Sequence, residues 1–97
     1  MNRYISLINW TDQGVRTYKE TVDRADAAAS AFQAAGGAMV DIYWLLGPYD
    51  IAVICDFPDD ETATAALLRL ATAGNIRTTT MRAFDRETAR SIIAKAG

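Results

Sequence analysis

The side chains that could carry chemistry in this chain of 97 residues are few, and none of them is a histidine. Histidine is the commonest general base and a frequent ligand of zinc and haem, so its absence removes most catalytic triads and most metal or haem sites. The sequence also has no Gly-rich phosphate loop and no Cys/His spacing typical of a metal site. It predicts no metal and no cofactor, so acid–base chemistry would have to depend on a carboxylate.

Asp50 is the carboxylate in the most suggestive position. It follows Gly47 and Pro48 and lies one residue into an apolar, strand-like stretch, on the face that we expect to be enclosed. A carboxylate in such a place is a candidate catalytic base, or a group that orients a ligand. The alternative is structural, because an Asp near a turn commonly bonds the local backbone or pairs with an arginine.

Three further side chains are candidate ligand contacts beside Asp50. Trp10 and Tyr43 are aromatic residues of the same predicted face, where they could hold the ring of a ligand or anchor an ordinary interface. Arg82 could neutralise Asp50 or bind an anion through its planar guanidinium group. Cys55 lies mid-strand among apolar neighbours. Without a histidine to activate it, we expect it to act as a small hydrophobic residue and not as a nucleophile.

The elements that must position these residues follow from the pattern of apolar side chains. Two strand-like arms, residues 39–46 and 49–57, flank Gly47 and Pro48 and predict an antiparallel hairpin. In the second arm one face is continuously apolar, because its side chains alternate between the two faces of the strand. That face consists of Ile51, Val53, Cys55 and Phe57.

Helix and strand signals flank the hairpin on both sides. A strand is predicted over residues 3–10, followed by one helix that begins at Thr11 or Asp12 and ends at Gly36. Its apolar positions recur every three or four residues: Val15, Tyr18, Val22, Ala25, Ala29 and Phe32. Beyond the hairpin, the carboxylates of residues 59–61 start a second helix, residues 76–84 form the fourth strand, and Asp85 caps a short last helix.

This order, β-α-β-β-α-β with an added C-terminal helix, predicts a single α+β domain of the ferredoxin-like type over residues 1–97. Four antiparallel strands in the order 4-1-3-2 would form one sheet, with two helices covering one face. We expect the more apolar strand positions to meet the helices: Ile5, Leu7, Val53 and Phe57. The open face would carry Ile8, Trp10, Tyr43, Leu45 and Ile54, mixed with Ser6, Asp50, Thr78, Thr80 and Arg82.

The open sheet face predicts self-association. A contiguous apolar patch usually has a partner, and a second copy packed sheet against sheet would give a two-fold homodimer. The alternative is that the terminal helix folds back over the same face and shields it with Ile92 and Ile93.

Composition narrows the range of partners. The formal net charge is −2 and the pI is near 4.9, whereas a nucleic-acid-binding domain needs a basic surface. No stretch approaches the roughly 20 apolar residues of a membrane span, and the first residues lack the pattern of a signal peptide. The single cysteine fits a reducing compartment. We therefore expect a cytoplasmic protein with neither nucleic-acid nor membrane partners.

Three stretches of the chain resemble the GYD-domain family, small bacterial proteins named for a Gly-Tyr-Asp signature. They are Arg3-Tyr4-Ile5, the turn from Gly47 to Asp50, and Gly74-Asn75-Ile76-Arg77-Thr78. In this sequence Pro48 stands between the Gly and the Tyr-Asp pair, so the turn reads Gly-Pro-Tyr-Asp. The resemblance implies a dimeric α+β barrel, in which two ferredoxin-like sheets pack face to face. Proteins of that architecture include cofactor-free monooxygenases, lactone isomerases, haem-handling enzymes and amino-acid-sensing regulatory domains.

Three functions remain open from the sequence. The first is a homo-oligomeric module that binds a small organic molecule or regulates a partner. The second is a cofactor-independent oxygenase or isomerase in which Asp50 is the base and Tyr43 or Trp10 holds the substrate. The third is an assembly protein whose inner face is filled by side chains. Fold alone does not choose among them, because one fold hosts many functions.

Overall fold

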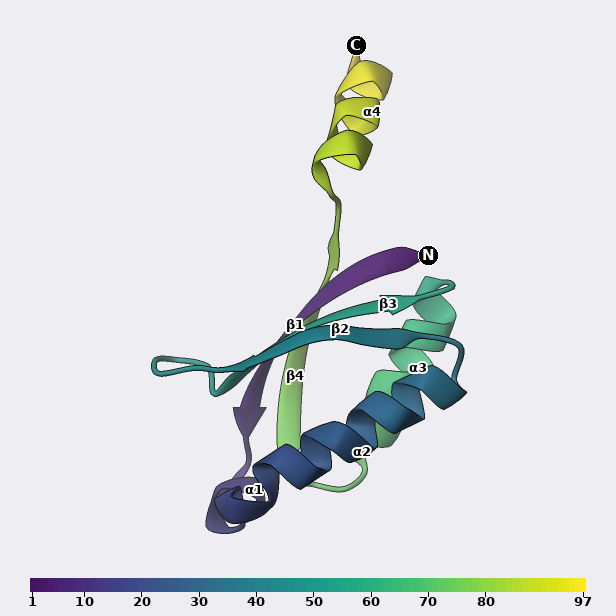
Figure 1. Ribbon diagram of the computed structural model, residues 1–97. Helices are drawn as coiled ribbons and strands as arrows, with labels where there is room; N and C mark the ends of the chain where they lie inside the picture. The colour runs from purple at the N-terminus through teal and green to yellow at the C-terminus, as the bar shows by residue number, and fades with distance from the viewer.

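The computed structural model describes all residues, 1–97, and confirms the predicted order of elements (Figure 1). Its elements are β1 (Asn2–Trp10), α1 (Asp12–Arg16), the 3-10 helix η1 (Tyr18–Glu20), α2 (Thr21–Ala34), β2 (Ala38–Trp44), β3 (Ile51–Phe57), α3 (Asp60–Ala71), β4 (Ile76–Ala83) and α4 (Arg86–Ala96). The hairpin arms are shorter than predicted, and the loop between them holds Gly47 at φ 145°, a value that favours glycine.

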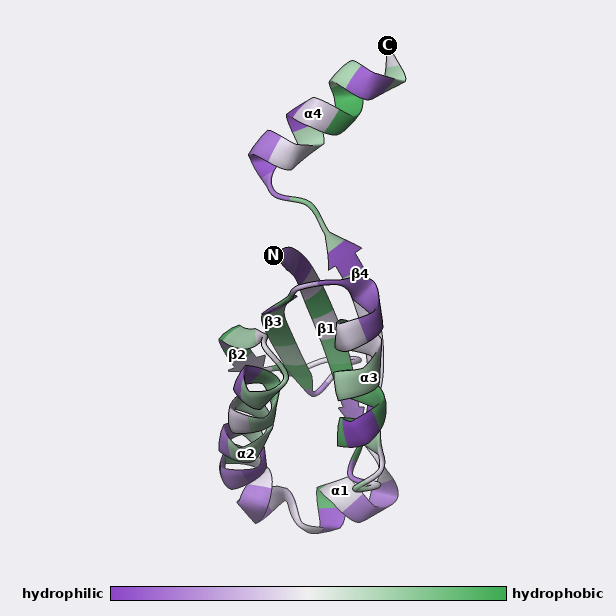
Figure 2. Cartoon of the chain, turned by 90° about the vertical axis from the view of Figure 1, so that its right-hand side faces the viewer, coloured by the Kyte–Doolittle hydropathy of each residue, from purple (hydrophilic) through white to green (hydrophobic).

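The four strands form one antiparallel sheet in the order β2-β3-β1-β4. This is the predicted order read from the opposite edge. Helices α2 and α3 lie on the same side of this sheet, which leaves the other side open (Figures 1 and 2). The ferredoxin-like α+β arrangement predicted from the sequence is therefore confirmed.

The helix-covered face differs from the prediction for two strands. Tyr4, Ser6 and Ile8 of β1 are buried under the helices, whereas Ile5 and Leu7 lie on the open face. The predicted assignment was wrong because β1 has apolar residues on both faces, so its own alternation does not choose between them.

The register with β3 determines which face of β1 meets the helices. Ser6 lies opposite Val53 and Tyr4 lies opposite Cys55, so these pairs share the apolar face of β3 that meets the helices. Through the register with β4, the same face includes Thr78, Thr80 and Arg82, which the sequence also placed on the open side. The polar Ser6 is accommodated because its Oγ lies 2.8 Å from Thr80 Oγ1.

The core is small and centres on Phe57, which has no exposed surface. The Phe57 ring meets Phe32 of α2 edge to face at 5.1 Å and Tyr4 of β1 at 6.2 Å between ring centroids. Ala63 of α3 completes this end of the core, as the predicted stripe of that helix requires. Phe32 and Ala63, the buried residues of the two helices in this core, therefore meet the sheet around Phe57.

The predicted first helix is divided into α1, η1 and α2. At the division the guanidinium group of Arg24 donates to the carbonyl oxygens of Gly14 and Thr17, which holds the chain in a turn. Val15, Tyr18 and Val22 consequently remain 46%, 54% and 54% exposed, so the predicted stripe is wrong for this half. It holds for Phe32, which is buried.

Helix α4 stands away from the rest of the molecule beyond the end of β4 (Figure 1). Asp85 caps it as predicted, accepting a hydrogen bond from the backbone N–H of Thr88. No residue of α4 is buried, and Ile93 is 69% exposed. The alternative in which this helix folds back over the open sheet face is therefore wrong for the single chain.

Candidate ligand-binding cavity

A cavity of about 790 Å³ lies between the sheet and helices α2 and α3. Hydrophobic residues make up 20 of its 26 lining residues, so it is an apolar site with a few polar groups. Its floor is the buried face of β1 and β3, including Ile8 and Val53. Helices α2 and α3, which carry many of the lining residues, stand opposite each other on this side of the sheet (Figure 2).

The cavity exists because its helical walls are built from alanine. The lining residues of α2 include Ala25, Ala27, Ala28, Ala31 and Ala34, and those of α3 include Ala65 and Ala66. Larger side chains at these positions would fill the space between the helices, as in an ordinary core. In the sequence, the alanines of residues 25–34 fit an ordinary helical stripe, so their periodicity alone did not predict a cavity.

Cys55 lies on the floor of the cavity and is a free, buried thiol. Burial raises the pKa of the Cys55 thiol to about 11, with a smaller contribution from the neighbouring Asp56 carboxylate. At neutral pH the thiol is therefore almost entirely protonated and a poor nucleophile, as the sequence analysis expected.

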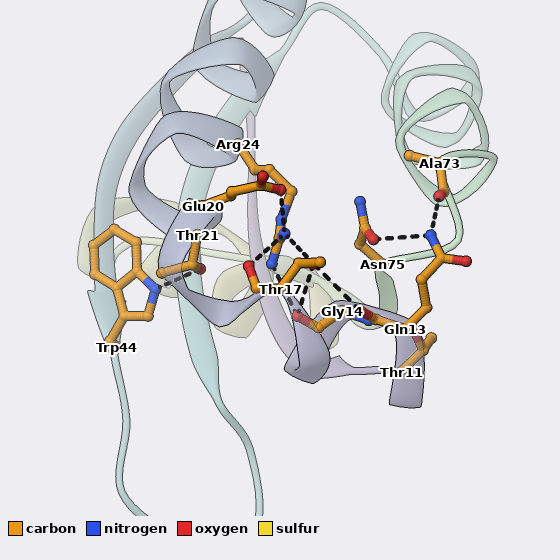
Figure 3. A network of polar contacts seen from close by, with 10 residues as sticks. All are labelled: Thr11, Gln13, Gly14, Thr17, Glu20, Thr21, Arg24, Trp44, Ala73 and Asn75. Carbon is orange, nitrogen blue, oxygen red and sulfur yellow. Dashed lines mark hydrogen bonds and ion pairs between the residues drawn. The ribbon is translucent and has the colours of Figure 1, made fainter.

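Polar groups gather at the α1 end of the cavity. Trp10 lines the cavity there, and its buried indole Nε1 has no hydrogen-bond partner in the protein. Asn75 also lines the cavity, and its Oδ1 accepts a hydrogen bond of 3.0 Å from Gln13 Nε2 (Figure 3). Its amide nitrogen points away from Gln13, into the space between α2 and α3 (Figure 3).

Arg24 of α2 is one of two cations that line the cavity, with Arg69 in the last turn of α3. Its Nη1 lies 2.8 Å from Thr17 Oγ1 and 3.0 Å from the Thr17 carbonyl, and its Nη2 lies 3.2 Å from the carbonyl of Gly14 (Figure 3). Glu20 Oε2 stands 3.7 Å from Nη1. Arg24 is thus a fixed cation that ties α2 to α1 while lining the cavity.

Asp50 lies immediately before β3 and is hydrogen-bonded to the end of β1. Its carboxylate Oδ2 accepts a hydrogen bond of 2.9 Å from the backbone N–H of Trp10, and its own N–H donates to the carbonyl of Ile8 at 2.9 Å. These bonds continue the β1–β3 ladder past its last paired residue. Asp50 does not line the cavity.

The other predicted site residues do not gather around Asp50. Tyr43 lies on the open face and donates from its hydroxyl to Asp41 Oδ2 at 2.8 Å, whereas Trp10 lies on the helix-covered face. The two aromatic residues cannot share one pocket, because they stand on opposite faces of the sheet. Of the four predicted residues, only Trp10 lines the cavity.

Arg82 belongs to a different cluster, at the opposite end of β4. Its Nε lies 3.4 Å from Asp60 Oδ1, and its guanidinium carbon lies 5.6 Å from the centroid of the Tyr4 ring and 5.0 Å from that of Phe84. The Tyr4 hydroxyl donates to the same carboxylate. Burial, followed by this hydrogen bond, raises the pKa of Tyr4. Arg82 therefore pairs with Asp60 and not with Asp50, which was one of the two roles expected for it.

Comparison with known proteins decides the family. The model of the GYD domain matches residues 4–93. The chain belongs to the GYD-domain family. A relative in Thermus thermophilus, named glutamine synthetase and cystathionine beta-lyase binding protein, is 31% identical over 85 residues, which are 87% of this chain and 90% of that protein.

Solved structures similar to this GYD-domain protein share its fold. TTHA0845 from Thermus thermophilus superposes with a TM-score of 0.57 at 21% identity, over 88% of this chain and 95% of that one. MtbAldR gives a TM-score of 0.68 at 12% identity, over 88% of this chain but only 54% of that one. An ACT domain protein from Streptococcus pneumoniae gives 0.51 at 11% identity, over 84% and 89%.

The chain thus spans about half the length of MtbAldR. At these low identities the likeness to all three structures concerns the fold alone. Within the structure, no helix is both long enough and apolar enough to cross a lipid bilayer. No three potential metal ligands from His, Cys, Asp or Glu come together.

Proposed function

We propose that this GYD-domain protein is a binding module without chemistry of its own, which self-associates through its open sheet face and holds a small molecule in the cavity. The observation that carries this proposal is the apolar cavity of about 790 Å³. Ligand sites in proteins are typically clefts of about 300–1,000 Å³ with apolar walls and a few polar groups. The cavity matches both properties.

The enzyme hypothesis has less support. A cofactor-independent oxygenase or isomerase with Asp50 as its base would need this carboxylate beside the substrate. Asp50 does not line the cavity, and its Oδ2 is engaged by the backbone N–H of Trp10. The third hypothesis, an assembly protein with an inner face filled by side chains, does not account for the cavity.

The open sheet face supports self-association with a second copy. Ile5, Met81 and Tyr43 are 37%, 44% and 55% exposed on this face. The chain as a whole exposes 6599 Å², whereas a compact monomer of its mass would expose about 5,500 Å². This excess of about 1,100 Å² is shared between the open sheet face and the projecting helix α4, none of whose residues is buried.

A protein partner is the second part of the proposal. The Thermus thermophilus relative is named for binding two enzymes, and by analogy we propose that this chain binds an enzyme too. The hairpin loop offers an apolar contact for it, because Leu46 is fully exposed at the loop and Leu45 is 40% exposed. Occupancy of the cavity would regulate this contact.

Native mass spectrometry of the protein purified from its own host tests the proposal. We expect a homodimer or a larger oligomer that carries an extra small mass. Ala66→Phe, which places a ring in the cavity, should remove the extra mass and leave the oligomer intact. Ala94→Phe on the exposed surface of α4 is the matched control and should keep the bound mass. A bare protein whose cavity also takes up no apolar probe would overturn the proposal.

A further inference from the structure

The groups at the α1 end of the cavity point to a class of ligand, an inference that rests on the proposed function above. We propose that the cavity binds an apolar molecule that ends in a carboxylate, such as a medium-chain fatty acid. The carboxylate would lie at the α1 end beside Trp10, Asn75 and Arg24, and the chain would run along the sheet towards Cys55.

The α1 end of the cavity offers hydrogen-bond donors that lack acceptors. The indole Nε1–H of Trp10 is buried and unpaired. The amide group of Asn75 uses its oxygen to bind Gln13, while its nitrogen makes no hydrogen bond in the structure. An unpaired buried donor is destabilising until an acceptor is supplied. A carboxylate supplies two acceptor oxygens and no donor.

The charged side chains that line the cavity are all cationic. Arg24 and Arg69 both line the cavity, and no Asp or Glu does. Arg69 lies in the last turn of α3, before the loop that leads to Asn75, and it forms no ion pair in the structure. Its charge is therefore available to a ligand, whereas Arg24 already stands near Glu20. An anionic head group would find two cations, whereas a cationic one would find no counter-charge.

The apolar part of the cavity extends along β1 and β3. Trp10 lies at one end of β1 and Tyr4, which pairs with Cys55 on the cavity floor, lies six residues away. At roughly 3.3 Å per residue these positions are about 20 Å apart. The space between them is lined mostly by alanines and by Phe32 and Met39. The polar Ser6 also lies there, but its Oγ is already paired with Thr80 Oγ1 at 2.8 Å. A long, thin hydrocarbon chain fits such a slot better than a compact polar metabolite.

Isothermal titration calorimetry with three probes of equal chain length tests the proposal: decanoate, decan-1-ol and decyltrimethylammonium, all below their aggregation concentrations. We expect decanoate to bind about tenfold more tightly than decan-1-ol, because a charged acceptor strengthens hydrogen bonds and adds an ion pair. The cationic probe should bind most weakly. Lengthening the acid from eight to ten carbons should tighten binding by about fourfold per methylene while the slot has room.

Two variants locate the carboxylate. Arg69→Gln removes an unpaired cation, and Trp10→Phe keeps the apolar ring but removes the N–H. Each should reduce the preference for decanoate over decan-1-ol by about three- to tenfold and leave decan-1-ol binding nearly unchanged. Arg90→Gln on α4 makes the same charge change away from the cavity and should retain the full preference. Circular dichroism confirms that each variant is folded.

The outcomes separate this inference from the proposed function. Equal binding of decanoate and decan-1-ol, or a preference that survives Arg69→Gln and Trp10→Phe, would overturn the carboxylate class and leave a ligand-binding cavity. If none of the three probes bound, the ligand class and the cavity's role in binding would both be overturned. A preference for decanoate that the two variants reduce and the control does not would support the inference.

Discussion

Asp50 is a residue whose surroundings explain it without catalysis. Its side chain and its backbone bind Trp10 and Ile8 on the neighbouring strand, so one residue secures both the end of β1 and the start of β3. The sequence left the catalytic and structural roles open, and the geometry gives this carboxylate a definite structural contact.

The role of Asp50 can be tested through stability. Asp50→Ala should lower the free energy of unfolding by about 1–2 kcal/mol, because it leaves the N–H of Trp10 without its acceptor. Asp50→Asn keeps a side-chain oxygen at the same place and should recover most of that loss. Urea denaturation of both variants measures the difference. An Asp50→Ala variant as stable as the wild-type protein would contradict the structural role.

Gly14 is a residue that the sequence analysis did not single out. It is buried, and a Cβ atom at this position would lie 1.9 Å from the carbonyl oxygen of Asn75. The close approach packs α1 against the loop before β4, where Thr11 Oγ1 also donates to the carbonyl of Gly74 at 2.6 Å.

We therefore expect Gly14→Ala to destabilise the protein by about 3 kcal/mol, because backbone must move to admit the methyl group. The expected loss is a lower thermal midpoint and a lower urea midpoint. Arg16→Ala changes an exposed residue of the same short helix and should have little effect, which makes it the control. Similar midpoints for the two variants would show that the loop before β4 moves to admit the methyl group without a loss of stability.

At the scale of elements, the ends of strands and helices are fixed by carboxylates. Asp59 and Asp85 cap α3 and α4, and their pKa values are lowered by hydrogen bonds from the backbone N–H groups of Thr62 and Thr88. On the open face, Arg3 binds Asp56 of the neighbouring β3 through two bonds, of 2.9 and 3.1 Å. The hydrogen bond from Arg3 lowers the pKa of Asp56.

These lowered pKa values predict the effect of acid. A carboxylate with a lower pKa in the folded state contributes stability above its unfolded pKa of about 3.9, and loses it as the pH falls through the folded value. The urea midpoint should therefore fall below pH 4. Asp56→Asn should have a lower midpoint at pH 7 and a smaller fall with acid, because one of the three groups is removed.

Asp26→Asn on the exposed side of α2 is the control for this comparison. Asp26 forms no ion pair or side-chain hydrogen bond, so the variant should keep the pH dependence of the wild-type protein. If the urea midpoint fell equally below pH 4 in the wild-type protein and in Asp56→Asn, the Arg3–Asp56 pair would not contribute to the pH dependence of stability.

At the scale of the whole molecule, the chain is extended for its length. Its radius of gyration is 14.5 Å, whereas a compact chain of 97 residues would have about 12.5 Å. Helix α4 accounts for much of the difference, since it extends from the body and buries none of its residues (Figure 1). Its charge is opposite to that of the body: residues 86–97 carry three cations and one anion, and residues 1–85 carry seven cations and eleven anions.

Self-association through the open face is the prediction at this scale. Ile5→Glu places a charge in the centre of that face and should convert the oligomer into a monomer, measured by light scattering after size-exclusion chromatography. Leu46→Glu makes the same change in the hairpin loop and should leave the oligomer unchanged. An Ile5→Glu variant that folds and still associates would show that copies meet elsewhere.

The sequence by itself determined the order of elements and the pairing of strands. Turn residues such as Gly47, caps such as Asp59 and Asp85, and the apolar face of residues 51–57 are local signals, and each reports on a few neighbouring positions. Such signals were sufficient for the ferredoxin-like fold and for the resemblance to the GYD-domain family, which the comparison confirms.

Only the tertiary structure decided which face of β1 meets the helices and where a ligand could bind. β1 is apolar on both sides, so its orientation depends on its register with β3, a contact between residues about 50 positions apart in sequence. The cavity likewise depends on the distance between two alanine-rich helices. The fold brings together, at one end of that cavity, three residues from separate elements: Trp10, Arg24 and Asn75. Their spacing along the sequence does not predict that they lie close together.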